Sequence, residues 1–249
     1  TVDWMLIYGN HGNGNGSNVA PVINTSEGSI SQGNVGGGNK NNSNGRQTLV
    51  LSSKDAGANG TMSAFVTVPI SQKNANATIN EFLNSGLIFR SNSDATDYSI
   101  LNLYGLSNGT LRIRVCKENG QGTNNANGGC MERNFSNLSV SSNSHAAIRM
   151  TLNDNTLTAV VTIDGQTETI VLNIAGYSNT ANKYVGMKMS DDAFSLYDIG
   201  WESASYPNEG CWSVPTVHCS FKANYLGGIV PQNTDVTPWI NLSSWFSEN

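Results

Sequence analysis

The sequence predicts an all-β protein built as an antiparallel β-sandwich or a barrel. About ten short segments alternate apolar and polar residues, and clusters of turn-forming residues separate them. Gly is abundant, with 26 residues, and Asn, Ser and Thr are frequent, whereas helix-favouring residues are scarce. The best helix candidate, residues 78–84, is long enough for about two turns at most.

Ten segments from residue 47 onward carry the strand pattern. One of them places Leu111, Ile113 and Val115 on one face, with Arg112 and Arg114 on the other. The ten predicted strands are Gln47–Ser53, Thr61–Val68, Gly86–Ser91, Tyr98–Tyr104, Leu111–Cys116, Ala146–Leu152, Leu157–Ile163, Thr167–Leu172, Tyr184–Met189 and Phe194–Trp201.

The clearest hairpin in the sequence joins two of these strands through Asp164 and Gly165. Both central residues of a type I′ turn need a positive φ, which Asp and Gly tolerate better than most residues do. The sequence therefore predicts that residues 157–163 and 166–172 pair directly through a two-residue turn.

The two ends of the chain differ from this regular part. Residues 1–46 contain a short strand-forming run, residues 1–8, followed by tracts rich in Gly and Asn. Residues 206–249 contain three of the five Trp residues and most of the Pro, which predicts a loop-rich extension that packs on the sandwich. We therefore divide the chain into an N-terminal segment (1–46), a β-sandwich (47–205) and a C-terminal extension (206–249).

Charge and hydropathy exclude two classes of protein. The net charge is −5, the isoelectric point is about 5.1 and only 12% of the residues are charged. No basic stripe is present that would neutralise phosphates, which argues against a nucleic-acid binder. No apolar run reaches 18 residues, so the sequence predicts no membrane-spanning helix.

The four cysteines indicate disulfides and an oxidising compartment. They fall into two pairs, Cys116 with Cys130 and Cys211 with Cys219, and neither pair has the short spacing typical of zinc sites. The chain starts at Thr1 without a signal peptide, which we interpret as a mature chain after signal removal. We expect a secreted or cell-surface glycoprotein. Its candidate glycosylation sites are Asn15, Asn24, Asn41, Asn59, Asn76, Asn108, Asn134, Asn137 and Asn241.

The order of the strand motifs resembles a known family. The motifs are Ser85–Arg90 (SGLIFR), Asp97–Tyr104 (DYSILNLY), Gly109–Arg114 (GTLRIR), Thr162–Gly165 (TIDG), Val185–Ser190 (VGMKMS) and Ala193–Asp198 (AFSLYD). Together they resemble the concanavalin A-like, or laminin G-like, jelly-roll modules of secreted bacterial proteins. The resemblance covers about residues 47–201 and implies two antiparallel sheets, one convex and one concave.

The resemblance also implies a binding face and a metal. In such modules the concave face or the loops at its rim often bind glycans, and several relatives are glycoside hydrolases or polysaccharide lyases. Many hold a structural Ca²⁺ near the position matched here by Asp198. Glu27 and Asp55 are our candidates for further carboxylate ligands.

The residues themselves favour binding over catalysis. A glycosidase needs two carboxylates at a defined separation, and the strands contain no row of acidic residues that would supply them. Aromatic rings stack on sugars, and Arg side chains on one strand face can meet acidic or hydroxyl groups. The candidate glycan-binding residues are Tyr98, Tyr104, Arg112, Arg114 and Trp212.

Three functions remain in competition. The favoured one is a non-catalytic module that binds a polysaccharide or a cell-surface glycan, as in adhesion. The first alternative is a structural subunit of an extracellular filament or matrix, in which residues 1–8 add as a strand to the sheet of a neighbouring copy. Pairing of residues 1–8 within their own sandwich is the simpler possibility. The second alternative is a polysaccharide-active enzyme.

Overall fold

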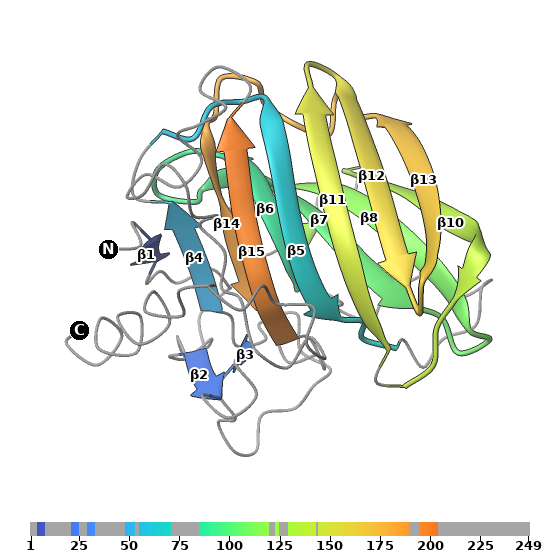
Figure 1. Ribbon diagram of the computed structural model, residues 1–249. Helices are drawn as coiled ribbons and strands as arrows, with labels where there is room; N and C mark the ends of the chain where they lie inside the picture. Colours follow the sequence, from blue (N-terminus) through green and yellow to red (C-terminus); the bar gives the residue numbers. More distant parts are fainter. Residues whose placement is uncertain are drawn as a thin grey trace.

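The structure is a computed structural model, and it is a sandwich of two antiparallel sheets (Figure 1). It describes residues 4–7, 21–24, 29–32, 48–52, 55–70, 85–119, 123–124, 129–142, 144–189 and 195–203. These residues contain strands and no helix, and therefore no helix that could cross a membrane. The prediction of an all-β antiparallel sandwich is confirmed.

The first sheet, sheet A, has its strands in an order that differs from the chain order. In space they run β1 (Trp4–Ile7), β4 (Thr48–Ser52), β14 (Tyr184–Met189), β6 (Gly86–Ser91), β7 (Asp97–Gly105), β8 (Thr110–Asn119) and β10 (Cys130–Ser139), and β9 (Thr123–Asn124) pairs with the end of β8.

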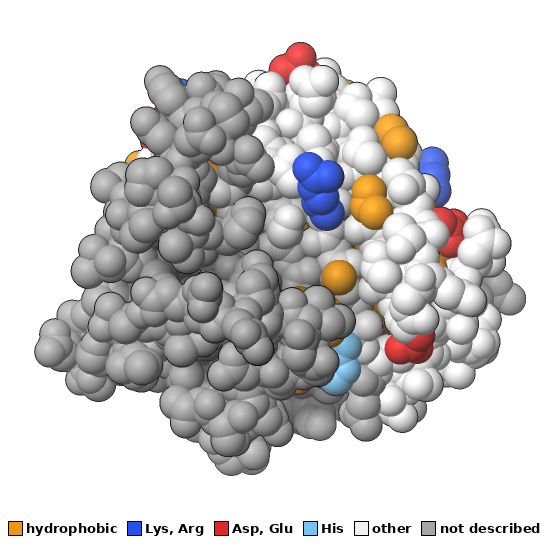
Figure 2. Space-filling view, viewed as in Figure 1, with side chains coloured by type: hydrophobic (Ala, Val, Ile, Leu, Met, Phe, Trp, Pro, Cys, Tyr) orange, Lys and Arg blue, Asp and Glu red, His pale blue; other side chains and the backbone are white. Residues whose placement is uncertain are grey.

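The second sheet, sheet B, packs on one face of sheet A. Its strands run β13 (Gln166–Asn173), β12 (Thr156–Ile163), β11 (His145–Asn153), β5 (Gly60–Thr67), β15 (Ser195–Ser203), β3 (Ser29–Gln32) and β2 (Pro21–Asn24). In the view of Figure 1 sheet B lies in front of sheet A. Figure 2 shows few charged side chains on the described part of the outer face of sheet B.

All ten strands predicted from residue 47 onward are present, two of them with the predicted bounds. The predicted hairpin is also confirmed: β12 pairs with β13 along its full length, and Asp164 and Gly165 have φ angles of 50° and 79°. The strand pattern did not predict β2, β3, β9 or the long edge strand β10. The helix candidate at residues 78–84 lies outside the described residues.

The main core lies between the two sheets and explains the alternation in the sequence. Burial in β5 alternates residue by residue, with Met62, Ala64 and Val66 in the core. Alternation disappears in β6 and β7, where both faces are buried. The outward-facing side chains of these two strands are therefore shielded from solvent, as the inward-facing ones are.

A carboxylate links the edge strands of the two sheets at one side of the sandwich. Glu168 of β13 pairs with Val161 in the register, which turns its side chain inward toward the edge of sheet A. Its two oxygens accept the backbone N–H groups of Ser136 and Asn137 in β10, at 2.8 and 2.7 Å. These residues lie where the β8–β10 register shifts, so Glu168 satisfies donors that the sheet does not pair.

The N-terminal strand belongs to its own sandwich in this structure. Residues Trp4–Ile7 pair antiparallel with Leu49–Ser52 of the same chain and form the edge of sheet A. The simpler of the two predicted arrangements, pairing within one chain, is the one observed.

The predicted bridge between Cys116 and Cys130 is present. It joins paired residues of β8 and β10 and encloses the turn between these strands, with a sequence separation of 14. The second predicted bridge, Cys211–Cys219, lies outside the described residues.

Removing the Cys116–Cys130 bridge should destabilise the fold measurably. A double substitution of both cysteines by alanine is expected to lower the free energy of unfolding by about 3 kcal/mol, because a closed loop of this length restricts the unfolded chain. Chemical denaturation of the two proteins under oxidising conditions measures the difference. An unchanged free energy of unfolding would contradict this assignment.

Candidate functional site

The outer face of sheet A, turned away from sheet B, gathers polar side chains from three adjacent strands. The strand register places Asn102 of β7, Arg114 of β8 and Glu132 of β10 side by side. The next outward-facing position on each strand adds the second row of the group. We call this group the polar patch, and it consists of Asn102, Tyr104, Arg112, Arg114, Glu132 and Asn134.

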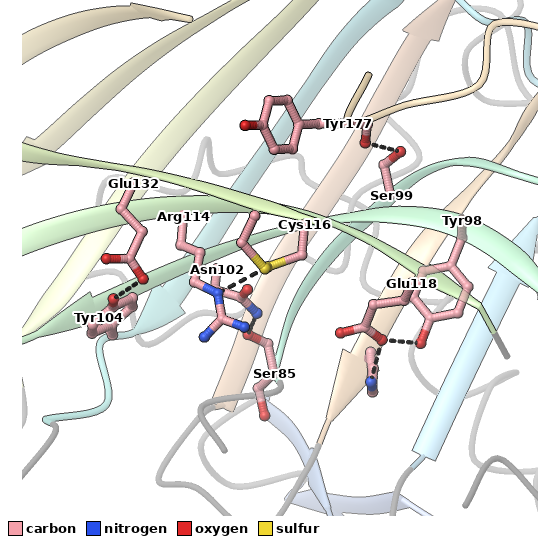
Figure 3. Close-up of a disulfide and its surroundings, with 12 residues drawn as sticks. Ser85, Tyr98, Ser99, Asn102, Tyr104, Arg114, Cys116, Glu118, Glu132 and Tyr177 are labelled. Atoms are coloured by element: carbon pink, nitrogen blue, oxygen red, sulfur yellow. Dashed lines mark hydrogen bonds and ion pairs between the residues drawn. A yellow bond between two sulfur atoms is a disulfide. The ribbon is translucent and has the colours of Figure 1, made fainter. Parts of the chain in front are cut away.

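Hydrogen bonds hold the exposed side of the polar patch in one geometry. Arg112 donates from Nε to Oδ1 of Asn134 at 2.7 Å and from Nη1 to Oε2 of Glu132 at 3.2 Å. The hydroxyl of Tyr104 donates to Oε1 of Glu132 at 3.2 Å, as Figure 3 shows. The side chains of Arg112 and Glu132 are 11% and 34% exposed, and Asn134 is exposed. A ligand can therefore reach the Asn134 amide and the partly exposed Glu132 carboxylate, and Arg112, which is mostly buried, holds both of them in place.

The other side of the polar patch is buried. Asn102 donates from Nδ2 to the carbonyl oxygen of Ser85 at 2.8 Å, and Arg114 donates from Nε to Sγ of Cys116 at 2.8 Å (Figure 3). Arg114 is 4% exposed and Tyr104 is fully buried. Burial, followed by the nearby charge of Glu132, raises the pKa of the Tyr104 hydroxyl, so it stays a neutral hydrogen-bond donor at ordinary pH.

A fully buried ionic cluster also lies on the outer face of sheet A. Oε2 of Glu118 accepts hydrogen bonds from Nζ of Lys188 at 2.6 Å and from the hydroxyl of Tyr98. Lys188 also lies 5.7 Å from the centroid of the Tyr98 ring. All three side chains are at most 1% exposed, and burial is the main cause of the raised pKa of Tyr98. We call these three residues the buried triad.

The structure brings together three of the predicted glycan-binding residues. Arg112, Arg114 and Tyr104 all belong to the polar patch, and the two arginines share a face as the alternation predicted. Trp212 lies outside the described residues.

The two predicted tyrosine platforms have a different role in the structure. Tyr98 and Tyr104 are 1% and 0% exposed, so neither ring offers a free face for stacking on a sugar. Each acts through its hydroxyl instead, by orienting a carboxylate: Tyr98 bonds Glu118, and Tyr104 bonds Glu132.

Sequence reasoning missed several members of these clusters. Glu132 and Asn134 come from β10, which was not recognised as a strand. Glu118 follows the predicted end of its strand, and Lys188 lies in a predicted strand but was not among the candidate site residues. Glu132 and Asn134 alternate along β10, and Glu118 continues the alternation of Arg112 and Arg114 along β8, a signal that only the strand assignment makes visible.

The predicted calcium ligands do not form a described cluster. Asp55 is exposed, and its carboxylate accepts the N–H of Gly57 and pairs with Lys183 at 3.2 Å. Only the backbone of Asp198 is described, in β15, and Glu27 lies outside the described residues. Among the described residues no three His, Cys, Asp or Glu side chains are grouped as a metal site. Calcium at Asp198 stays a prediction.

The described sequons differ in accessibility. Asn108, Asn134 and Asn137 are exposed. Asn59 is engaged on both sides of its amide, because Nδ2 donates to Asp154 and Oδ1 accepts from Arg90. A glycan on Asn59 would leave Nδ2 a single N–H for that bond to Asp154.

Comparisons with known proteins give fold-level matches. No family model matches the sequence, and no curated protein matches it. Among solved structures, it is similar to the carbohydrate-binding module CBM66 from Bacillus subtilis, with 12% identity, 81% of this chain and 96% of that chain covered, and a TM-score of 0.47. A legume lectin-like domain from Entamoeba histolytica matches with 8% identity, 81% and 90% coverage and a TM-score of 0.47.

An enzyme is also among the structural matches. The alginate lyase from Klebsiella pneumoniae matches with 10% identity, 77% of this chain and 87% of that chain covered, and a TM-score of 0.42. At such identities the likeness concerns the fold alone.

Proposed function

We propose that this protein is a secreted or cell-surface module that binds a polysaccharide or a cell-surface glycan without transforming it. The observation that supports the proposal is the solvent-facing side of the polar patch, where the mostly buried Arg112 holds the Glu132 carboxylate and the exposed Asn134 amide in one fixed arrangement. The ligand would lie on the outer face of sheet A, over β8 and β10.

The chemistry of these three groups suits sugar hydroxyls. A guanidinium donates hydrogen bonds in a fixed fork, a carboxylate accepts two, and an amide does both, so each can hold neighbouring hydroxyls of one ring. Because Arg112 is already bonded to Asn134 and Glu132, little side-chain freedom remains to be lost on binding.

The same arrangement is poorly suited to glycosidase chemistry. The single carboxylate of the polar patch, Glu132, is bonded to both Arg112 and Tyr104. The other outward-facing carboxylate of this region, Glu118, is buried and paired with Lys188. A pair of carboxylates flanking an accessible cleft, which hydrolysis of a glycosidic bond needs, is not formed by these two residues.

The Cys116–Cys130 disulfide supports the proposed extracellular location. The Cys116–Cys130 disulfide is of the kind that persists in oxidising compartments and is rare where thiols are kept reduced. It also fixes β10 to β8, the two strands that carry the exposed side of the polar patch.

Arg112 provides the direct test. We expect native electrophoresis in gels containing alginate, polygalacturonate, xylan or mixed-linkage β-glucan to show retarded migration in at least one gel. Arg112→Ala should weaken that retardation at least tenfold in apparent Kd, because it removes the central donor of the polar patch. Arg149→Ala, on the exposed outer face of β11 in sheet B, is the matched control and should migrate as the unchanged protein does.

Two outcomes would contradict the proposal. One is unaltered migration in every gel, and the other is retardation that Arg112→Ala leaves intact while the thermal unfolding midpoint is unchanged.

A further inference from the structure

One of the candidate glycosylation sites lies inside the polar patch. Asn134 begins the sequon Asn134-Phe135-Ser136 on β10, and the register pairs it directly with Arg112 of β8. Glu132, the carboxylate of the polar patch, precedes it by two residues on the same strand. A residue that helps to form the proposed binding site is therefore also one that an N-linked glycan can modify.

The bonding of the Asn134 amide leaves the atom that carries such a glycan available. Oδ1 accepts the hydrogen bond from Nε of Arg112 at 2.7 Å, whereas a glycan is attached to Nδ2. Asn134 is exposed, and its Nδ2 donates to no other residue in the part of the chain that the structure describes. Attachment at Nδ2 is therefore compatible with the bond from Arg112.

The rest of the sequon also tolerates the modification. Phe135 is 3% exposed and belongs to the main core between the sheets, while Asn134 and Ser136 on either side of it are exposed. The backbone N–H of Ser136 donates to Glu168 at 2.8 Å, so the fold uses the backbone of this residue. A glycan on Asn134 would disturb neither the core nor the link to Glu168.

The other described sequons do not have this position. Asn108 lies in the turn between β7 and β8, and Nδ2 of Asn59 is bonded within a loop network. Asn137 lies on β10, as Asn134 does, but it is not a member of the polar patch. Among the described sequons, Asn134 alone joins a modification site to the proposed binding site.

We propose that an N-linked glycan on Asn134 covers the polar patch and blocks the binding of external glycans. This inference rests on the proposed function. Arg112 and Glu132 are the cross-strand and same-strand neighbours of Asn134 on one face, at Cβ separations of about 5 and 7 Å. An oligosaccharide is much larger than these separations, so it occupies the space in which a ligand would meet both side chains.

The modification is a transfer of an oligosaccharide from a lipid diphosphate, the donor class of the secretory pathway. Nδ2 of Asn134 forms a bond to C1 of the first sugar, and the bond between C1 and the diphosphate oxygen breaks. The lipid diphosphate leaves with the electron pair of that bond, and Nδ2 loses one proton to a base of the transferase. The product keeps the amide carbonyl that accepts from Arg112.

Ser136→Ala is the variant that tests this inference. It removes the sequon, leaves Asn134 unchanged and keeps the backbone N–H that donates to Glu168. Ser136→Thr keeps the sequon and is the matched control. These variants and the protein with Ser136 all carry Ser139→Ala, which removes the neighbouring sequon at Asn137, and all are secreted from insect cells.

Mass mapping of peptides after enzymatic glycan release should show Asn134 modified in the protein with Ser136 and in Ser136→Thr. Native electrophoresis in gels containing alginate, polygalacturonate, xylan or mixed-linkage β-glucan then measures binding. Ser136→Ala should bind with an apparent Kd at least about tenfold lower than the two modified proteins, because no attached glycan competes for the surface. The protein with Ser136 produced in bacteria that lack the transferase should bind as Ser136→Ala does.

Two results would overturn the inference. One is an unmodified Asn134 in the protein secreted with Ser136, and the other is a modified protein that binds as tightly as Ser136→Ala. Failure of the proposed function gives a different result: the bacterial protein and Ser136→Ala, both folded by circular dichroism, would migrate without retardation in every gel. That result would overturn the proposed function and this inference together.

Discussion

Replacing Arg90 by alanine is expected to lower the free energy of unfolding by about 4 kcal/mol. The guanidinium is fully buried and donates to the carbonyl oxygens of Ala58 and Asp154 at 2.9 and 2.5 Å, to Oδ1 of Asn59 at 3.0 Å and to Oγ of Ser178 at 2.7 Å. Its removal leaves several acceptors without a donor in a site that water reaches poorly.

The backbone of Arg90 shows why this side chain reaches so many loops. Its φ angle is +47°, and it lies where the pairing of β6 with β14 shifts register. This bulge lets Arg90 tie together the segment before β5, the turn between β11 and β12 and the loop between β13 and β14. A single residue thus connects three loops at one end of the sandwich.

Urea unfolding monitored by circular dichroism measures the expected loss at Arg90. Arg90→Lys should recover little of it, because a single ammonium group cannot reproduce the fork of donors. Arg149→Ala is the exposed control and should change the free energy of unfolding by less than about 0.5 kcal/mol. A loss below about 1 kcal/mol for Arg90→Ala would mean that the network is not stabilising.

Replacing Glu118 by glutamine is the second substitution with a large expected effect, a loss of about 3 kcal/mol. The amide still accepts a hydrogen bond, but the ammonium of Lys188 then lies in a buried site without a counter-charge. The cost is therefore mainly that of an unpaired buried cation.

A double-mutant cycle separates this cost from any loss of packing. Lys188→Met removes the cation and keeps most of the side-chain volume, so the double variant with Glu118→Gln should be more stable than Glu118→Gln alone by at least about 1 kcal/mol. If chemical denaturation gives Glu118→Gln and the double variant the same free energy of unfolding, the charge of Lys188 does not determine the stability lost in Glu118→Gln.

The strand motifs predicted most of the sandwich because its core strands alternate clearly. β6 and β14 have their predicted bounds, and Asp164-Gly165 forms the predicted tight turn. β10 was missed because Glu132, Arg133 and Asn134 are three polar residues in a row and the strand lies at the edge of its sheet. At such an edge neither face has to be apolar, so the periodicity disappears.

The candidate site was only partly predictable for the same reason. Alternation was enough to place Arg112 and Arg114 on one face, and the structure adds Glu132 and Asn134 from the unrecognised strand. The burial of Tyr98 and Tyr104 depends on what covers the outer face of sheet A, which local sequence patterns do not encode. Their facing direction could be predicted, whereas their inaccessibility could not.

The measurement that tests the proposed function most directly is a glycan array probed with the full-length protein and with Arg112→Ala. If the outer face of sheet A binds glycans through the polar patch, the unchanged protein will bind a chemically related group of glycans and Arg112→Ala will lose that group. Absence of binding to every glycan, or an identical binding pattern for the folded Arg112→Ala variant, would contradict the account.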